Sequence, residues 1–564
     1  MKKIIFAIVF AFAGIINDTQ AQTIIAEGIC GESLTWIFTD DNTLTISGSG
    51  AMYAYDYDNY SQTWSPYAEQ LKAVVIDDGV TTIGQCAFAM CSDLASIAIA
   101  NTVDSIGKNA FSFCSSLVSV TIPNSVRFIG EGAFSDCIGL QSVAISNAVD
   151  MIKDWTFSFC TNLTSVEIPN SVNTIGKGAF SFCYDLALIE IPTSVTSIEN
   201  QAFGFCNITS VAVPKSVEMI AYSAFMNCSN LTAINVDIDN PVYHSQDGLL
   251  YSKLQDTLVC CPGGKTGAII IPSSVTAIGD RAFSDCSKLT SIAIPTSVNK
   301  IGEGAFYGCN SLTSIAIPKF VSDIADNTFA RCSKLASIEI PDSINTIGGE
   351  AFSNCWSLSS IEIPNTVHTI GRYAFCDCRS LSSIEIPEAV DVINWGTFLR
   401  CSNLTSVTVP ESVNTLELLA FSDCIHVDTF TCKASPPPAI FQHTFNNIPS
   451  TVGLIVPCHA SFDYQNSDWG HIFTNIAEDC TIGICKLTQN EKLRLYPNPT
   501  KNSFFIDYEN VGTIKIYDMS GKEVLTKNAN GKTEINISRL PEGIYNVSIL
   551  SEGKIIGTGQ IIKQ

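Results

Sequence analysis

Charged side chains are scarce in this sequence, and basic ones are the scarcest. Only 15% of the 564 residues are charged, and 31 Lys and Arg stand against 54 Asp and Glu, which gives a formal net charge of −23. A nucleic-acid-binding protein needs a basic surface to meet phosphates, so the composition argues against that class. A net negative charge instead suits a surface or extracellular protein that self-repulsion keeps dispersed.

Histidine is rare as well, and the motifs of common catalytic sites are missing. The six His form neither HxxxH nor HExxH, and Cys376 and Cys378 have no second Cys pair, so zinc is not predicted. The chain has no GxSxG elbow and no Gly-rich phosphate loop. Cys458 and His459 are sequence neighbours in a terminal segment, which makes a poor nucleophilic dyad. We therefore expect no enzyme activity, no cofactor and no metal.

Long apolar runs are confined to the N-terminus. Residues 1–21 begin with two lysines, continue with an apolar run from Ile4 to Ile16 and finish in a small-residue cleavage site at Ala21. The run is shorter than the ~20 apolar residues that a spanning helix needs. The pattern predicts a secretory signal peptide, with a membrane anchor as the alternative, and no membrane span in the mature protein.

What the sequence has in abundance is one 23-residue unit, roughly SVxxIGxxAFxxCxxLxSIxIP. Residues 171–192 read SVNTIGKGAFSFCYDLALIEIP, and residues 297–318 read SVNKIGEGAFYGCNSLTSIAIP. Fourteen units carry a Phe with a Cys three residues later, and a fifteenth, degenerate unit has Phe445. Typical pairs are Phe180 with Cys183, Phe306 with Cys309 and Phe352 with Cys355.

This period lies in the leucine-rich-repeat range and predicts a solenoid. One coil cannot cover its own apolar face, but coils stacked about 4.8 Å apart turn single side chains into continuous ladders. We expect a mainly β fold, with a leucine-rich-repeat solenoid of about 15 coils and then a small immunoglobulin-like β-sandwich. The repeated Cys is interpreted as a buried thiol that packs like a small apolar side chain. Crosslinks between rungs or a metal ladder are the alternatives.

Breaks in the period divide the chain. The step of 58 residues between Phe225 and Phe283 contains two strand-like runs around Asp247-Gly248, which predicts a hairpin. The predicted parts are a β cap (22–70), the solenoid (71–448) with an enlarged hairpin coil (234–275), a C-terminal cap and linker (449–486), and a final domain (494–564). Four Cys near the C-terminal end of the solenoid lie outside the ladder, and we expect any disulfides among them, with the pairing undetermined: Cys432, Cys458, Cys480 and Cys485.

Two groups of residues are candidates for a binding surface. The outward position of the IxIP segment is acidic in several coils, at Glu167, Glu190, Glu339, Glu362 and Glu385. These glutamates either attract a basic partner or a divalent cation, or they are a solvated face that prevents aggregation. An aromatic cluster in the N-terminal cap either contacts a sugar or a protein, or packs over the cap. It comprises Tyr53, Tyr55, Tyr57, Tyr60 and Trp64.

The repeat unit and the segment CGESLTWIFTDDNTLTISGSGAMYAY near the N-terminus resemble BspA-like leucine-rich-repeat surface proteins, over roughly residues 26–475. The last 70 residues or so contain LPEGIYNVSI and the motif Tyr496, Pro497, Asn498, Pro499 and Thr500. They are similar to the type A C-terminal sorting domain of the type IX secretion system.

These resemblances imply export to the outside of a Gram-negative cell by the type IX machinery. The sorting domain is then removed, and the protein is attached to the outer surface or released. They further imply a secreted adhesin that binds host matrix or cell-surface proteins, or other bacteria, without catalysis. A structural spacer with no specific ligand is the alternative, and a surface hydrolase is less favoured.

Overall fold

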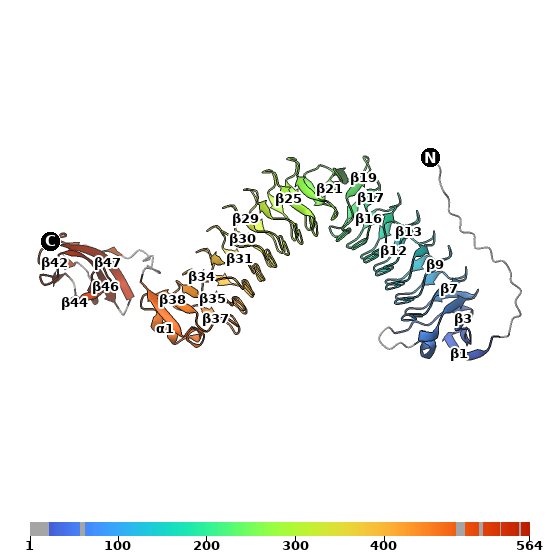
Figure 1. Cartoon of the computed structure of the whole chain (residues 1–564), viewed down its shortest axis with the longest axis horizontal. Helices are drawn as coiled ribbons and strands as arrows, with labels where there is room; N and C mark the ends of the chain where they lie inside the picture. The colour runs from blue at the N-terminus through green and yellow to red at the C-terminus, as the bar shows by residue number, and fades with distance from the viewer. Residues whose placement is uncertain are drawn as a thin grey trace. The chain divides into compact units, whose positions relative to one another are not determined.

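The computed structural model describes residues 22–56, 62–480, 491–493, 495–506, 511–530, 532–551 and 554–564. The predicted signal peptide lies outside these residues. The chain divides into two compact units. The first runs to Phe430 and includes Pro438–Val452, and the second comprises Thr431–Pro437 and Gly453–Gln564. Figure 1 shows the coils of the first unit following one another in chain order.

Each regular coil has two short strands joined by turns. In one coil these are β13 (Ser165–Glu167) and β14 (Thr174–Ile175). The first strand buries Val166 and exposes the residues on either side of it, as alternation predicts. Pro169 follows, and since proline has no N–H to donate, the strand ends. The mainly β solenoid fold is therefore confirmed.

Strands of the first kind make the long-strand row, which pairs in parallel from coil to coil. Ser142 of β11 lies opposite Ser119 of β9 on one side and Ser165 of β13 on the other, so the register step is one repeat. The strands of this row are β7 (Ser96–Ile99), β9 (Ser119–Thr121), β11 (Ser142–Ala144), β13, β15 (Leu188–Ile189), β17 (Ser210–Val213), β19 (Ala233–Val236), β23 (Gly267–Ile270), β25 (Leu289–Ala293), β27 (Ser314–Ala316), β29 (Ser337–Glu339), β32 (Ser383–Glu385), β34 (Ser406–Val409) and β36 (Thr429–Cys432).

Strands of the second kind make the short-strand row, also parallel. Ile152, Ile175 and Ile198 lie opposite one another in three successive coils. The strands are β6 (Val80–Ile83), β8 (Ser105–Ile106), β10 (Phe128–Ile129), β12 (Met151–Ile152), β14, β16 (Ser197–Ile198), β18 (Met219–Ile220), β24 (Ala277–Ile278), β26 (Lys300–Ile301), β28 (Asp323–Ile324), β30 (Thr346–Ile347), β31 (Thr369–Ile370), β33 (Val392–Ile393), β35 (Thr415–Leu416) and β37 (Ala439–Ile440).

The N-terminal cap extends the stack. Its strands are β1 (Ile24–Gly31), β2 (Leu34–Thr39), β3 (Thr43–Gly48) and β4 (Gly50–Ala51), followed by the short helix η1 (Ser65–Gln70) and β5 (Ala73–Ile76). β1 and β2 are antiparallel, but β3 pairs in parallel with β5 and so begins the ladder. Because such strands add turns, the described part of the solenoid makes about 18 turns rather than about 15.

The enlarged coil contains the antiparallel strands β20 (Tyr243–Gln246), β21 (Leu249–Ser252) and β22 (Thr257–Cys260). Asp247 and Gly248, both at positive φ, connect the first two. β22 then pairs in parallel with β24, so the short-strand row resumes after the insertion.

The interior consists of side-chain ladders. From Phe88 to Phe225 and from Phe283 to Phe445, the rings of successive coils stack 5.2–5.9 Å apart and within 15° of parallel. The Cys beside each Phe is buried. Twelve of the fourteen ladder thiols donate a hydrogen bond to the Phe carbonyl of the preceding coil, at 3.0–3.3 Å. This bond gives the sulfur a role beyond apolar packing.

The Gly of the IG dipeptide lets neighbouring coils approach closely. A Cβ on Gly107 would lie 2.5 Å from the backbone nitrogen of Gln85, and one on Gly371 would lie 2.4 Å from that of Gly349. Such contacts are shorter than van der Waals packing permits. The requirement for glycine there comes from the adjacent coil.

The second unit contains the C-terminal cap and the final domain. The cap has β38 (Gly453–Pro457), α1 (Ser461–Gln465), η2 (Asp468–His471) and β39 (Asn475–Asp479). The final domain has a sheet in the order β40-β47-β46-β43-β44 and a second in the order β41-β42-β45. Their bounds are β40 (Glu491–Lys492), β41 (Leu495–Tyr496), β42 (Ser503–Ile506), β43 (Val511–Tyr517), β44 (Glu523–Asn530), β45 (Thr533–Asn536), β46 (Gly543–Ser551) and β47 (Lys554–Lys563).

Both sheets contribute to one apolar cluster, which includes Phe504, Ile516, Ile535 and Val547. β40 pairs with β47 in parallel, so the domain is not wholly antiparallel. Its immunoglobulin-like topology stays a prediction. No helix within the described residues is long and apolar enough to cross a membrane.

Candidate binding surfaces

One surface of the first unit is made by the turns around the ladder Phe residues. We call it the turn face and define it as the residues from three before to five after each ladder Phe. The backbone reverses there through two left-handed positions, such as Gly178 (φ 60°) and Phe182 (φ 61°) around Phe180. At the second of these positions Phe159 is exposed and Phe182 is half-buried, whereas Ser181 and Cys183 beside Phe182 are buried.

In the coils before the hairpin, the turn face carries phenylalanines. Phe159, Phe182 and Phe205 occupy the same repeat position, and their rings stack at 4.2 and 4.3 Å. Trp155 lies one coil before Lys177, whose ammonium is 5.6 Å from the centre of the indole. This part of the turn face is an apolar stripe bordered by lysine.

In the coils after the hairpin, the turn face carries arginines beside aromatic rings. Five of the eight arginines in the chain lie there, namely Arg281, Arg331, Arg372, Arg379 and Arg400. Both Arg281 and Arg331 lie over the ring of Tyr307, at 5.9 and 5.5 Å. Arg372 lies 6.0 Å from the ring of Trp395, and Arg379 lies 5.7 Å from the ring of Trp356. A guanidinium over an aromatic face is an attractive cation–π contact.

Asp377 anchors two of these arginines. Its carboxylate is buried and forms ion pairs with Arg379 at 2.8 Å and with Arg400, from the next coil, at 3.6 Å. Both guanidinium groups stay largely exposed. The buried carboxylate therefore holds two cations in position while leaving their outer edges open to a partner.

A hollow of about 490 Å³ lies in the same part of the turn face and spans four coils. Its wall includes the indole of Trp356, the amides of Asn310 and Asn354, and the cations Arg331 and Lys334. Asp285 lines it as well, and burial raises the pKa of that carboxyl. Gly308 leaves room beside Asp285, because a Cβ there would lie 2.5 Å from its carboxylate oxygen.

The predicted acidic positions are all exposed, on the long-strand row rather than on the turn face: Glu167, Glu190, Glu339, Glu362 and Glu385. Glu167 and Glu190 lie in consecutive coils, and so do the other three. Residues 358–364, around Glu362, form no strand between β29 and β32. Like charges directly opposite each other destabilise a sheet, which is consistent with this interruption.

The predicted aromatic contact in the N-terminal cap is wrong for two of its five residues, Trp64 and Tyr55. Trp64 is 1% exposed and Tyr55 is 7% exposed, so both belong to the core. Trp64 stacks on Phe88 at 5.3 Å and forms the first rung of the ring ladder. Tyr53 is exposed, while Tyr57 and Tyr60 lie outside the described residues. Trp64 takes the place of the first rung because the first ladder Phe has no preceding coil to supply a ring.

The ladder cysteines are buried free thiols. Cys183, Cys309 and Cys355 are each fully buried, and burial raises the pKa of all three thiols. A thiolate is the reactive form of cysteine, so these side chains are poor nucleophiles and poor metal ligands. Their place is beside Phe180, Phe306 and Phe352 in the interior ladders.

The terminal cap contains the disulfide between Cys458 and Cys480. Cys432 is a buried free thiol, and Cys485 lies outside the described residues. Cys458, His459 and Glu478 have donor atoms within 4.8 Å of one another. However, a disulfide sulfur is neither a thiolate ligand nor a nucleophile, so this group does not make a metal site or a catalytic dyad.

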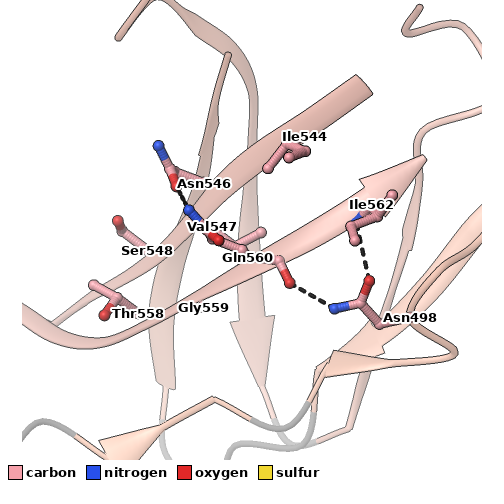
Figure 2. A pocket seen from close by; sticks show the side chains of 9 residues that line it. All are labelled: Asn498, Ile544, Asn546, Val547, Ser548, Thr558, Gly559, Gln560 and Ile562. Atoms are coloured by element: carbon pink, nitrogen blue, oxygen red, sulfur yellow. Dashed lines mark hydrogen bonds between the residues drawn. The ribbon is translucent and has the colours of Figure 1, made fainter. Parts of the chain in front are cut away.

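In the final domain the sorting motif lies against the last strand. The side-chain amide of Asn498 donates to the carbonyl of Gln560 at 2.7 Å and accepts from the backbone N–H of Ile562 at 2.9 Å (Figure 2). Thr500 continues this contact, because its N–H also donates to Ile562. Tyr496 stacks on Phe505, and the two prolines, Pro497 and Pro499, separate these three residues.

A hollow of about 640 Å³ lies over β46 and β47 beside Asn498. Asn546 and Gln560, which are hydrogen-bonded to each other, line it together with Ser548 and Thr558 (Figure 2). The sorting motif is thus fixed to the sheet next to a polar, open surface.

Comparisons with known proteins agree with this architecture. The family profile "BspA type Leucine rich repeat region" matches residues 67–184, 150–251, 263–381 and 322–452, and "Secretion system C-terminal sorting domain" matches residues 494–564. A search of curated proteins found no match.

Several solved structures are similar in fold. A leucine-rich repeat protein from Eubacterium ventriosum is 26% identical, with 71% of this chain and 94% of that chain covered and a TM-score of 0.47. A leucine rich cell surface protein from Faecalibacterium prausnitzii is 26% identical, with coverages of 72% and 95% and a TM-score of 0.41. The pneumococcal vaccine antigen PcpA is 19% identical, with coverages of 80% and 98% and a TM-score of 0.41.

Proposed function

This chain belongs to the BspA-type leucine-rich repeat family, and from that premise we propose that it is a non-catalytic adhesin whose turn face binds a macromolecular partner. Its C-terminal sorting domain marks it as a secreted protein, handled by the type IX secretion system and displayed at the cell surface. A protein in that place meets host surfaces and other cells first. The solenoid is the part available to bind them, since the final domain serves export.

The observation that carries this proposal is the exposure of large aromatic and arginine side chains in consecutive coils. Trp356 is 50% exposed and Trp395 is 36% exposed, although neither is needed to fill the core. Trp, Tyr and Arg are the residues that most often dominate the energy of protein interfaces. Repetition over several coils also supports binding through many modest contacts, which together give avidity.

The interior supports a non-catalytic role. The space between the two strand rows is filled by the Phe and Cys ladders, so a substrate would find only the outer surface. Cys458, the one cysteine that the sequence placed beside a histidine, is disulfide-bonded and is therefore not an activated nucleophile. A surface hydrolase is therefore the least supported alternative.

The glutamates of the long-strand row are the second candidate surface, and a basic partner would bind there. To separate the two surfaces, we would measure binding of the chain from Gln22 onward to immobilised matrix proteins, host cells and bacterial cells. The Glu339→Gln, Glu362→Gln, Glu385→Gln triple variant tests the acidic row. The Arg331→Gln, Trp356→Ala double variant tests the turn face.

We expect saturable binding that the triple variant retains and the double variant weakens by about tenfold or more. The opposite pattern, with loss in the triple variant and weakening by salt, would place the site on the acidic row. Absence of saturable binding to all three kinds of surface would favour a structural spacer and contradict the adhesin.

A further inference from the structure

The turn face after the hairpin combines three kinds of group that rarely occur together on a surface. The exposed indoles of Trp356 and Trp395 lie there with the half-buried phenol ring of Tyr307. Guanidinium groups are placed on or beside those rings. Amides and carboxylates, such as those of Asn310 and Asp285, lie between them. The rings can pack on a flat apolar face of a ligand, and the guanidinium groups can bind an anion. The amides and carboxylates can form hydrogen bonds with hydroxyl groups.

The hollow at Trp356 brings all three together. Arg379 lies over the indole from the following coil, whereas the other residues of the hollow come from the same coil and the three preceding ones. One face of the ring is thus supported by a cation, and the indole is half exposed at the end of the hollow. Arg331 and Lys334 supply positive charge in the coil just before it.

This combination matches a sugar ring with an acidic substituent. The axial C–H groups of a pyranose form an apolar face that packs on an indole, while its hydroxyls donate to carboxylate and amide oxygens. A carboxylate or sulfate on the sugar pairs with a guanidinium through charge-assisted hydrogen bonds. The cavity volume of about 490 Å³ is in the range of small-molecule sites.

The spacing of the cations favours a chain of such sugars over other polyanions. Arg281, Arg331, Arg372, Arg379 and Arg400 are spread over six coils. They form three groups, Arg281, Arg331 and the set Arg372, Arg379 and Arg400, each separated from the next by a coil without arginine, which suits separate anionic groups rather than the dense phosphates of a nucleic acid. Acidic residues between them, including Glu303 and Glu350, would repel a dense polyanion but can accept hydrogen bonds from hydroxyls.

We propose that the turn face from Arg281 to Arg400 binds a linear acidic polysaccharide, with a sugar ring against Trp356 and its carboxylate or sulfate group on Arg331 and Lys334. The proposal rests on the proposed adhesin function and names the ligand class of the same surface. Asp377 is a positioning residue in this site, because it holds Arg379 and Arg400 without facing the hollow.

The test uses the chain from Gln22 onward and four defined probes. Alginate carries carboxylates, heparin carries sulfates, dextran is neutral, and polyglutamate is an acidic polypeptide without sugar rings. Binding is measured by isothermal titration at several salt concentrations for the parent, the Arg331→Gln, Trp356→Ala double variant and Arg331→Glu. The matched control is Arg127→Gln with Trp155→Ala, which removes the same residue types from the coils before the hairpin.

We expect saturable binding of alginate or heparin, with the stronger of the two identifying the acidic group. The double variant and Arg331→Glu should each bind at least about tenfold more weakly, and the control should stay within about twofold of the parent. Circular dichroism of each variant verifies that the solenoid remains folded, and Arg331→Glu changes only an exposed side chain.

Equal loss in the control variant, or equal binding of dextran, would overturn the proposal. Equal binding of polyglutamate would replace the polysaccharide by an acidic protein partner. If neither acidic polysaccharide binds while host cells or matrix proteins still bind saturably, this inference fails and the adhesin function stands. If nothing binds at all, both fail.

Discussion

The coils from Phe88 to Phe225 and those from Phe283 to Phe421 stack their rings in the same way, at 5.2–5.8 Å in the first run and 5.2–5.5 Å in the second. Their turn faces differ completely. The first run presents stacked Phe rings, and the second presents arginines paired with Tyr and Trp.

The difference shows that the inward and the outward side chains of one turn are under different constraints. Inward side chains must fit against the inward side chains of the coils on either side, because one poorly fitting residue interrupts the ladder. The second left-handed position of the turn is less constrained, because residues as different as Phe205, Arg331 and Asn354 occupy it. Variation in function can therefore accumulate outside without disturbing the fold.

Removing a ladder ring should have the largest effect and should be the same in both runs. We expect Phe180→Ala and Phe352→Ala each to cost about 3–5 kcal/mol, since both rings are fully buried and the coils above and below cannot collapse into the space. Urea unfolding followed by circular dichroism measures this. Phe159→Ala, on the turn face, is the control and should cost about 1 kcal/mol or less. A large disparity between the first two variants would break the equivalence of the interiors.

Alkaline pH should destabilise both runs through their thiols. Burial raises the pKa of Cys228 in the first run and of Cys332 in the second to about 12. Unfolded thiols titrate near pH 8.5, so the folded chain keeps protons that the unfolded chain releases. The contribution of each thiol is complete below about pH 8.5 and is lost as the pH rises toward 12, by about 1.4 kcal/mol per pH unit.

Unfolding in urea at pH 8 and pH 10 checks this expectation. The free energy of unfolding should fall between the two pH values, and Cys228→Ala and Cys332→Ala should each make that fall smaller by about 1–2 kcal/mol. Iodoacetamide gives an independent measurement, because buried protonated thiols should be alkylated only after unfolding. Rapid alkylation of the native chain at pH 8 would contradict the buried ladder.

Neutralising a turn-face carboxylate should change the stability differently in the two runs of coils. Asp377→Asn leaves Arg379 and Arg400 without their shared anion, and we expect a loss of about 1–3 kcal/mol. Asp136 has the equivalent position in the first run, where burial raises the pKa of its carboxyl. Asp136→Asn should therefore be neutral or slightly stabilising. Matched thermal unfolding scans of the two variants measure the contrast, and equal losses would show that the arginines add nothing at Asp377.

Most of the fold followed from the sequence because its cause is local and repeated. A Phe, a Cys and an IxIP segment at fixed spacing require the same coil each time, so one unit predicts the next. Strand β1 and the short helices of the C-terminal cap were not predicted, since these segments do not repeat the 23-residue unit. Trp64 illustrates this, because an aromatic residue in a cap can equally be a contact or the first rung of a ladder.

The turn-face site was missed for another physical reason. Consensus analysis emphasises positions that repeat, whereas Arg331, Trp356 and Arg372 occupy positions that vary from coil to coil. Aligning the coils on their ladder Phe and comparing the non-repeating columns would have gathered the five arginines. The pairing of guanidinium with ring still needs coordinates, because those partners come from adjacent coils.

Removing charge from the long-strand row should have the smallest effect, and it should increase the free energy of unfolding. Glu339, Glu362 and Glu385 lie at one repeat position in three consecutive coils, and Glu167 and Glu190 lie at it in two. The triple Gln variant should be more stable than the parent by about 0.5–1 kcal/mol at low salt. The Glu167→Gln, Glu190→Gln control should gain about half of that stability. Both gains should vanish at 1 M salt, where the Debye length falls to about 3 Å. A loss of stability in the triple variant would mean that these carboxylates are held by a bound cation, and the row would then be a site instead of a tolerated repulsion.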